Sequence, residues 1–204
     1  MEIKHTIPVL EIFTSPQGEG SEMGYLVTFV RLAGCNLRCP WCDTKESWEV
    51  GNCRMTFDEV LMQIDATRIV ITGGEPCMHR NVSDLVDFLK VHGYHVSMET
   101  NGTLPTPKKL DWCVVSPKPG KYFVHEDCHA DEYKLVIDKK RIEDWEGTKE
   151  LIQHLAAGGK TVWLQPEANI ANDSASAIQL LLSEMNHIRN IRMGIQMHKA
   201  FDIK

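Results

Sequence analysis

The chain has 204 residues, of which 43% are hydrophobic and 25% are charged, and these values suit one folded domain with a sizeable core. Its net charge of −6 argues against a nucleic-acid partner, because proteins that bind nucleic acids usually carry a basic surface. No window of about 18 apolar residues predicts a membrane span. Because Glu2, His5 and Glu11 interrupt the N-terminus, we expect no signal peptide and a cytoplasmic protein.

Short β-rich segments alternate with helical patterns along the chain. A capping box formed by Thr56 and Glu59 opens the first predicted helix. Further helices are predicted at 82–92, 144–157 and 175–186. Strands are predicted at 25–31, 68–72, 94–99, 112–116, 133–137, 161–165 and 191–196.

This alternation predicts an α/β fold with a mainly parallel sheet. A closed barrel of this kind needs eight strands and about 250 residues, and the chain offers about six to seven strands. We therefore expect an incomplete TIM-type barrel with an open sheet, in a single domain that spans residues 1–204.

Unusual polar and glycine-rich segments follow five of the predicted strands. Because parallel α/β folds place their active sites at the carboxyl ends of strands, these segments predict one shared site. They are residues 34–44 (GCNLRCPWCDT), 72–76 (TGGEP), 99–102 (ETNG), 116–118 (SPK) and 165–166 (QP).

The first of these segments carries three cysteines, Cys35, Cys39 and Cys42. Clustered thiolates are typical ligands of iron–sulfur clusters, and three of them would leave one iron of a [4Fe–4S] cluster open for chemistry. The alternative is a structural zinc site, although no histidine lies near the loop in sequence and Asp43 would be an uncommon fourth ligand. The remaining cysteines are interpreted as ordinary small side chains: Cys53, Cys77, Cys113 and Cys128.

The Cys-x3-Cys-x2-Cys spacing, with Trp41 before the third cysteine, resembles the signature of radical S-adenosylmethionine (SAM) enzymes. The resemblance implies that the open iron binds the amino and carboxylate groups of SAM, and that the reduced cluster cleaves SAM to a 5′-deoxyadenosyl radical. The segment Gly73-Gly74-Glu75-Pro76 resembles the "GGE" motif of the same family, which hydrogen-bonds the methionine amino group.

A second resemblance narrows the class. Residues 11–20 (EIFTSPQGEG), with 29–35 and 42–44, are similar to the 7-carboxy-7-deazaguanine synthases, and the likeness runs through nearly the full chain to 196–199. It implies conversion of 6-carboxy-5,6,7,8-tetrahydropterin to 7-carboxy-7-deazaguanine with loss of ammonia, a step toward queuosine and other deazapurines. It also implies that about the first 24 residues (1–24) form a substrate-binding extension.

The same resemblance implies a set of site residues, with the radical borne by the cofactor and no catalytic side chain. The substrate pocket would comprise Pro16, Gln17, Gly18, Glu19, Arg31, Thr72 and His198. The SAM contacts would comprise Trp41, Cys42, Asp43, Gly74, Ser116, Pro117, Lys118, Gln165 and Pro166. Mg²⁺ would bind at Thr44 beside the substrate carboxylate.

Read without the resemblance, these residues have simpler interpretations. The segment 17–20 would be a flexible polar turn, Arg31 a solvent-facing residue at a strand end, and Thr44 a capping residue. Two other functions share parts of the pattern: an activase for a glycyl-radical enzyme, and a zinc-binding interaction module.

Two segments depart from the synthase family. The chain continues beyond residues 196–199 to 200–204, where that family often ends in a short tail whose carboxylate reaches the substrate, and residues 167–170 differ from its usual glycine-containing loop. The resemblance also implies a homodimer, and the reduced cluster requires an electron donor such as a flavodoxin.

We expect Cys39→Ala to abolish both iron binding and SAM cleavage, because a cluster held by two thiolates is not retained. Iron content and SAM cleavage after anaerobic purification measure this. A full cluster with normal activity in the variant would show that another cysteine, such as Cys53, is the true ligand.

Overall fold

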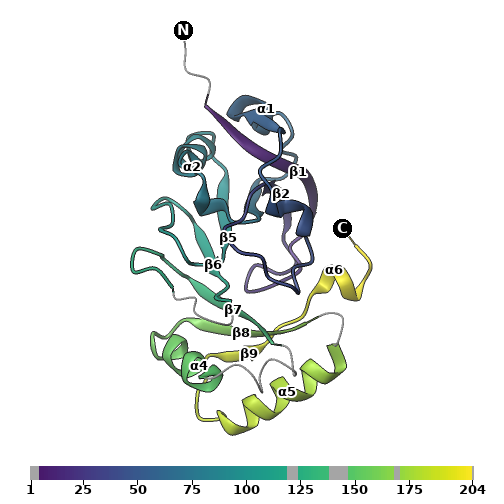
Figure 1. Ribbon diagram of the computed structural model, residues 1–204, viewed down its shortest axis with the longest axis vertical. Coiled ribbons are helices and arrows are strands. Elements are labelled where there is room, and N and C mark those ends of the chain that lie inside the picture. The colour runs from purple at the N-terminus through teal and green to yellow at the C-terminus, as the bar shows by residue number, and fades with distance from the viewer. Residues whose placement is uncertain (1–4, 119–123, 138–146, 168–170, 204) are drawn as a thin grey trace.

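Figure 1 shows the computed structural model, which describes residues 5–118, 124–137, 147–167 and 171–203. Its strands form one open, curved sheet of nine strands in the order β3-β1-β2-β4-β5-β6-β7-β8-β9. The expected open, mainly parallel sheet is therefore confirmed.

All seven strands predicted from the sequence are present, and each pairs in parallel with its neighbour. The last of them ends at Met193 rather than at residue 196. Gly194 follows it, where a side chain would collide with Gln165. The seven strands are β2 (Leu26–Leu32), β4 (Arg68–Gly73), β5 (His95–Thr100), β6 (Trp112–Val115), β7 (Glu132–Ile137), β8 (Thr161–Pro166) and β9 (Ile191–Met193).

Two further strands were not expected, so the estimate of about six to seven strands was too low. Strand β1 (Thr6–Pro16) pairs antiparallel with β2, and the short β3 (Arg54–Thr56) pairs antiparallel with β1. Together they extend one edge of the parallel sheet. The residues expected to form a substrate-binding extension therefore begin in this antiparallel part of the sheet, where β1 lies between β3 and β2.

Helices α1, α2, α4 and α5 correspond to the four helices predicted from the sequence, whereas the short α6 was not expected. Thr56 and Glu59 form the predicted capping box, in which the Thr56 hydroxyl accepts from the Glu59 amide at 3.2 Å. The first three residues of the helix predicted at 144–157 lie outside the described residues. The helices are α1 (Phe57–Leu61), α2 (Val82–Val91), α4 (Thr148–Ala157), α5 (Ala171–Glu184) and α6 (Met197–Ala200), with the 3-10 turns η1 (Lys45–Trp48) and η2 (Pro76–Met78).

Side chains on a strand alternate between its two faces, and here the two faces differ in polarity. One face is apolar and packs against the helices, as Ile69 and Ile71 of β4 do with Leu85 and Leu89 of α2. A second apolar cluster joins β7 and β8 to α4 and α5. The opposite face, called the inner face below, carries the polar residues of the same strands. Among the helices described, none is long and apolar enough to cross a membrane.

Candidate active site

A cavity of about 280 Å³ lies at the inner face, where the loops at the carboxyl ends of the strands meet. It gathers nearly every residue that the sequence predicted for the site. Pro117 is the exception, because it is buried without lining the cavity, and its contact with SAM stays a prediction. The predicted residues that line the cavity are Pro16, Gln17, Gly18, Glu19, Arg31, Cys35, Cys39, Trp41, Cys42, Asp43, Thr44, Thr72, Gly74, Ser116, Lys118, Gln165, Pro166 and His198.

The cysteine loop is held by backbone hydrogen bonds to η1. The Gly34 amide donates to Ser47 O at 2.8 Å, and the Cys35 amide donates to Trp48 O at 3.1 Å. These bonds turn the loop so that all three cysteines line the cavity.

The chemistry of the three thiols fits a cationic metal group. Burial raises the pKa of Cys35, and the nearby charges of Glu75, Cys39 and Cys42 raise it further. Three thiolates at one cavity therefore repel one another, and iron ions would relieve that repulsion. In the described ranges, no three His, Cys, Asp or Glu side chains converge as they would around one ion, whereas each thiolate of a cluster binds its own iron.

The glycines after β4 leave backbone, rather than side chains, facing the cavity. A side chain at Gly74 would collide with the carbonyl oxygen of Gly34, and Gly73 has a φ of +139° that disfavours any residue with a Cβ. Close packing of this loop against the cysteine loop thus requires both glycines. Their exposed backbone suits the hydrogen bonds to the SAM methionine group that the "GGE" resemblance implies.

The third residue of that motif, Glu75, is fully buried and does not line the cavity. Its carboxylate accepts hydrogen bonds from the Thr100 hydroxyl (2.6 Å), the Asn101 amide (2.7 Å) and the Cys77 amide (3.0 Å). Burial raises the pKa of Glu75, although these donors oppose the shift. Glu75 therefore joins the loop after β4 to the end of β5 and supports the cavity wall from behind.

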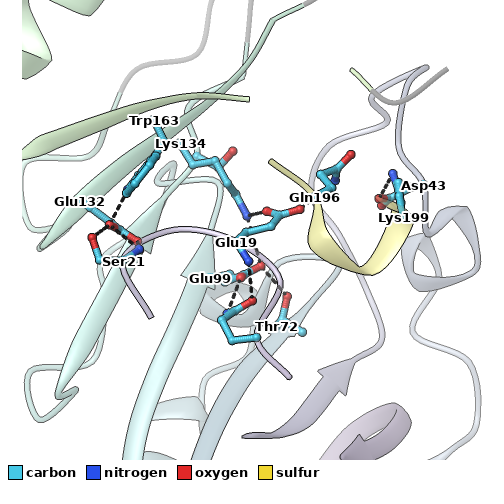
Figure 2. Close-up of polar contacts among 12 residues, drawn as sticks. Glu19, Ser21, Asp43, Thr72, Glu99, Glu132, Lys134, Trp163, Gln196 and Lys199 are labelled. Atoms are coloured by element: carbon cyan, nitrogen blue, oxygen red, sulfur yellow. Dashed lines mark hydrogen bonds and ion pairs between the residues drawn. The ribbon is translucent and has the colours of Figure 1, made fainter. Parts of the chain in front are cut away.

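The loop between β1 and β2 crosses the inner face to the far side of the sheet. Ser21 donates its amide and hydroxyl to Glu132 at the start of β7, and Trp163 also donates to Glu132 at 2.7 Å (Figure 2). Glu22 forms an ion pair with Arg68, the first residue of β4, at 2.8 Å. The loop thus covers the amino ends of several strands and closes the cavity on the side away from the cysteines.

Three charged side chains, one of them from this loop, meet at the inner face of the sheet. Lys134 of β7 forms an ion pair with Glu19 and lies 3.5 Å from Glu99 of β5 (Figure 2). Gln17 donates to Glu99 at 3.2 Å. Burial opposes the charge of Lys134, but the two carboxylates outweigh it and raise the lysine pKa. Burial acts to raise the pKa of Glu19, but the charge and hydrogen bond of Lys134 lower that pKa below its ordinary value.

Sequence reasoning missed Lys134 and gave Glu99 no role. Glu99 is the second-last residue of β5 and was singled out as part of a strand-end motif. Lys134 stands inside a β-rich segment, where its alternation with Tyr133 and Leu135 was the available signal for an inward-facing charge.

The C-terminal α6 and the residue before it connect the loop between β1 and β2 with the cysteine loop. Gln196 donates to Glu19 at 2.7 Å, and the Met197 amide donates to Gly18 O at 3.0 Å. Lys199 forms an ion pair with Asp43 at 3.0 Å (Figure 2). Burial alone would raise the pKa of Asp43, and Lys199 lowers it below its ordinary value.

Two residues predicted to serve the substrate carboxylate and Mg²⁺ lie at the same end of the cavity. Arg31 lines it and donates its Nε to Glu11 at 2.8 Å. Thr44 donates its hydroxyl to Asp43 at 3.3 Å and occupies the N-cap position of η1. The charge of Arg31 also helps to lower the pKa of Asp43.

The cysteines interpreted as ordinary side chains lie away from the cavity lining. Cys113 is buried in the small apolar cluster on β6, and burial raises its pKa far above the ordinary value. Burial has the same effect on Cys77, and it raises the pKa of Cys128 to about 11. Thiols with such high pKa values carry little thiolate at neutral pH.

Comparison with known proteins identifies the family. The model of the Radical SAM superfamily matches residues 29–165. Proteins named 7-carboxy-7-deazaguanine synthase are 36% identical in Aquifex aeolicus (97% of this chain, 94% of the relative) and 34% identical in Synechocystis (97% and 93%). The chain belongs to the 7-carboxy-7-deazaguanine synthase family. It is also similar to the crystal structure of QueE from Escherichia coli, with a TM-score of 0.74, 29% identity and 95% coverage of both chains.

Membership of this family decides between the readings of the cysteine loop. As a radical SAM enzyme, the chain takes a [4Fe–4S] cluster and SAM, so the zinc-module interpretation is wrong. The glycyl-radical activase interpretation is also wrong, because the synthase relatives match almost the whole chain.

The anchoring of the loop between β1 and β2 generates a stability prediction. Gly20 has φ +71°, and a side chain there would collide with Glu132, whereas Gly24 has φ +91° and nothing within 4 Å. Gly24→Ala should cost about 1–2 kcal/mol of unfolding free energy from backbone strain alone. Gly20→Ala should cost roughly 1–3 kcal/mol more because of the collision. Equal urea-unfolding curves for the two variants would show that the loop does not pack on Glu132 in solution.

Proposed function

We propose that the chain is a radical SAM carbon–nitrogen lyase that converts 6-carboxy-5,6,7,8-tetrahydropterin to 7-carboxy-7-deazaguanine with loss of ammonia, in deazapurine and queuosine biosynthesis. One observation carries the proposal. Residues 16–19 precede the 29–165 match to the radical SAM superfamily, yet they line the same cavity as the three cysteines. Residues within the superfamily match and residues outside it therefore line one cavity, which supports a cofactor and a substrate bound side by side.

One end of the cavity offers groups that would bind the cofactors. Cys35, Cys39 and Cys42 would hold the cluster, and Gly74 and Ser116 would contact SAM. When bound, the cluster and SAM supply a radical that removes a hydrogen atom from the substrate. The proposed reaction uses no side chain as a nucleophile. The protein would bind, orient and shield the reacting ring.

The substrate would lie between a cationic group and an acceptor-rich group. Arg31 offers a guanidinium, whose planar fork matches a carboxylate. Gln17 and Glu19 offer an amide and a carboxylate to the polar edge of the pterin, and Thr72 and His198 complete this wall of the cavity. These contacts would hold the reactive C6 position toward the cofactor.

Mg²⁺ fits the edge of the cavity at Thr44. This ion commonly keeps most of its waters and takes one or two protein oxygens together with substrate oxygen. A hydroxyl beside the Asp43 carboxylate therefore suffices as the protein share of the site. The ion would orient the substrate carboxylate and reduce its negative charge.

We further propose a single domain in which about the first 24 residues (1–24) form the substrate-binding extension. The polar contacts of Gln17, Glu19 and Ser21 across the inner face support this division. A cytoplasmic homodimer that accepts electrons from a flavodoxin-like donor completes the proposal. Sedimentation of the purified protein and reduction of its cluster by flavodoxin test the last two points.

The decisive experiment is anaerobic incubation of the reconstituted enzyme with SAM, dithionite, Mg²⁺ and 6-carboxy-5,6,7,8-tetrahydropterin. We expect mass spectrometry to detect 7-carboxy-7-deazaguanine. SAM cleavage without this product would retain the superfamily chemistry and refute the proposed substrate.

The Arg31→Lys variant should keep the charge and lose the planar fork. We expect pterin binding to weaken by about 1–3 kcal/mol while SAM binding stays normal. Arg54→Lys is the matched control, because Arg54 bonds Thr6 outside the cavity and its variant should leave KM unchanged. A wild-type KM for the pterin in Arg31→Lys would remove this residue from the carboxylate site.

The Thr44→Val variant removes the proposed Mg²⁺ ligand and keeps the side-chain shape. It should lower the stimulation of turnover by Mg²⁺ and leave iron content and substrate-free SAM binding normal, whereas Thr44→Ser should keep much of the stimulation. Turnover measured against Mg²⁺ concentration compares the three proteins. If Thr44 only steadies the cluster loop through its hydrogen bond to Asp43, the Val variant would damage that loop and show no selective change in its Mg²⁺ dependence.

A further inference from the structure

Lys134 places a charge where burial makes it energetically unfavourable. It lies in the middle of a buried strand with only 11% of its side chain exposed, and the Glu19 side chain that it contacts is equally buried. Removing two such charges from water opposes folding, and buried ion pairs are often replaceable by apolar residues without loss of stability. The fold alone therefore gives little reason for a lysine at this position.

The position of Lys134 relates it to the ligand instead. Its ammonium touches Glu19 from the loop after β1 and Glu99 from β5, and all three residues line the cavity. Gln196 donates to the other oxygen of Glu19, and Gln17 donates to the other oxygen of Glu99. The Thr72 hydroxyl also donates to Glu99, at 3.5 Å, so each carboxylate is oriented from at least two sides. Because each carboxylate oxygen can accept about two hydrogen bonds, the pair keeps acceptor capacity for a ligand.

We propose that Lys134 is a positioning residue that holds Glu19 and Glu99 together as an ionised acceptor pair, and that this pair selects a ring edge with two hydrogen-bond donors. The inference rests on the proposed function and deepens it. Two carboxylates and one ammonium leave a net charge of about −1, which favours donors over acceptors. The 2-amino and N3–H groups of a pterin form such an edge, whereas a 2-oxo analogue replaces one donor with an acceptor.

The electrostatic reason for the lysine is the repulsion between its partners. Two nearby carboxylates without a counterion retain a proton between them at pH values where each alone would be ionised. A protonated carboxyl group would present a donor where the ligand needs an acceptor. The other ionisable groups around the pair are Lys118 beyond β6, His198 of α6 and Glu132 on the same strand as Lys134.

Calorimetry of the holoenzyme with SAM, under anaerobic conditions and without reductant, tests the inference through binding alone. The probes are 6-carboxypterin and its 2-oxo analogue 6-carboxylumazine. We expect wild type to prefer the pterin, and its affinity at each pH between about 6 and 7.5 is the reference for the variants, because His198 also lines the cavity. Lys134→Met should bind the pterin about 10- to 100-fold more weakly, with a reduced preference over the lumazine.

The pH profile separates positioning from a purely structural role. Affinity of Lys134→Met for the pterin should rise as pH rises, because the shared proton is lost and the acceptor pair returns. The double variant Lys134→Met/Glu99→Gln should lose this pH dependence, since one carboxylate remains without a partner. Lys90→Met is the matched control, because Lys90 pairs with Asp111 at 2.6 Å outside the cavity and its loss should leave pterin binding unchanged.

Equal pterin binding by wild type and Lys134→Met would overturn the inference, as would a uniform, pH-independent loss accompanied by weaker SAM binding. If Lys134→Met does not fold, the double variant decides: it should fold and bind the pterin about 10- to 100-fold more weakly than wild type. Wild-type affinity in the double variant would refute the inference. Wild-type holoenzyme that binds no pterin would instead refute the proposed function.

Discussion

The two-residue period of the parallel strands is the constraint on which this structure depends. It forces Ile69, Val96 and Leu135 onto the face that the helices cover, and it forces Thr72, Glu99 and Lys134 onto the opposite face. An ordinary parallel sheet is apolar on both faces because both are covered by helices. Here the inner face is polar because it is covered by a loop and lines the cavity, rather than packing against helices. Alternate positions of these strands therefore line the cavity, and the positions between them build the core.

The same period explains which parts of the structure the sequence could reveal. The seven parallel strands have clear β-rich patterns, and the glycine-rich or polar segments that follow five of them predicted the cavity. Strand β1 was not predicted because Pro8 and Glu11 interrupt its pattern. Pro8 has no amide to donate, but its carbonyl oxygen accepts from the Ala33 amide at 3.1 Å. The short β3 is too brief to produce a periodic signal.

Long-range contacts could not be predicted from the sequence, because no local pattern of residues indicates them. The Ser21 to Glu132 contact joins residues 111 positions apart, and the Gln196 to Glu19 bond joins residues 177 positions apart. A serine in a polar loop and a glutamate at a strand start are both ordinary alone. Only the curvature of the sheet brings them together, and that curvature depends on packing of the entire chain. The resemblance supplied Glu19 as a site residue but not the lysine that holds it.

The charges around the cavity are arranged so that one orientation of a charged, flat substrate is favoured. Arg31 and Lys199 stand on the side of Asp43 and Thr44, and Glu19 and Glu99 stand together at Lys134. A ligand with a carboxylate at one end and hydrogen-bond donors at the other matches this polarity, and the reversed ligand would place its carboxylate against two others. Like-charge contacts at close range in a buried site cost several kcal/mol, more than any single favourable contact returns. Under the proposed function, the cavity would therefore orient its substrate by disfavouring the reversed pose as much as by binding the right one.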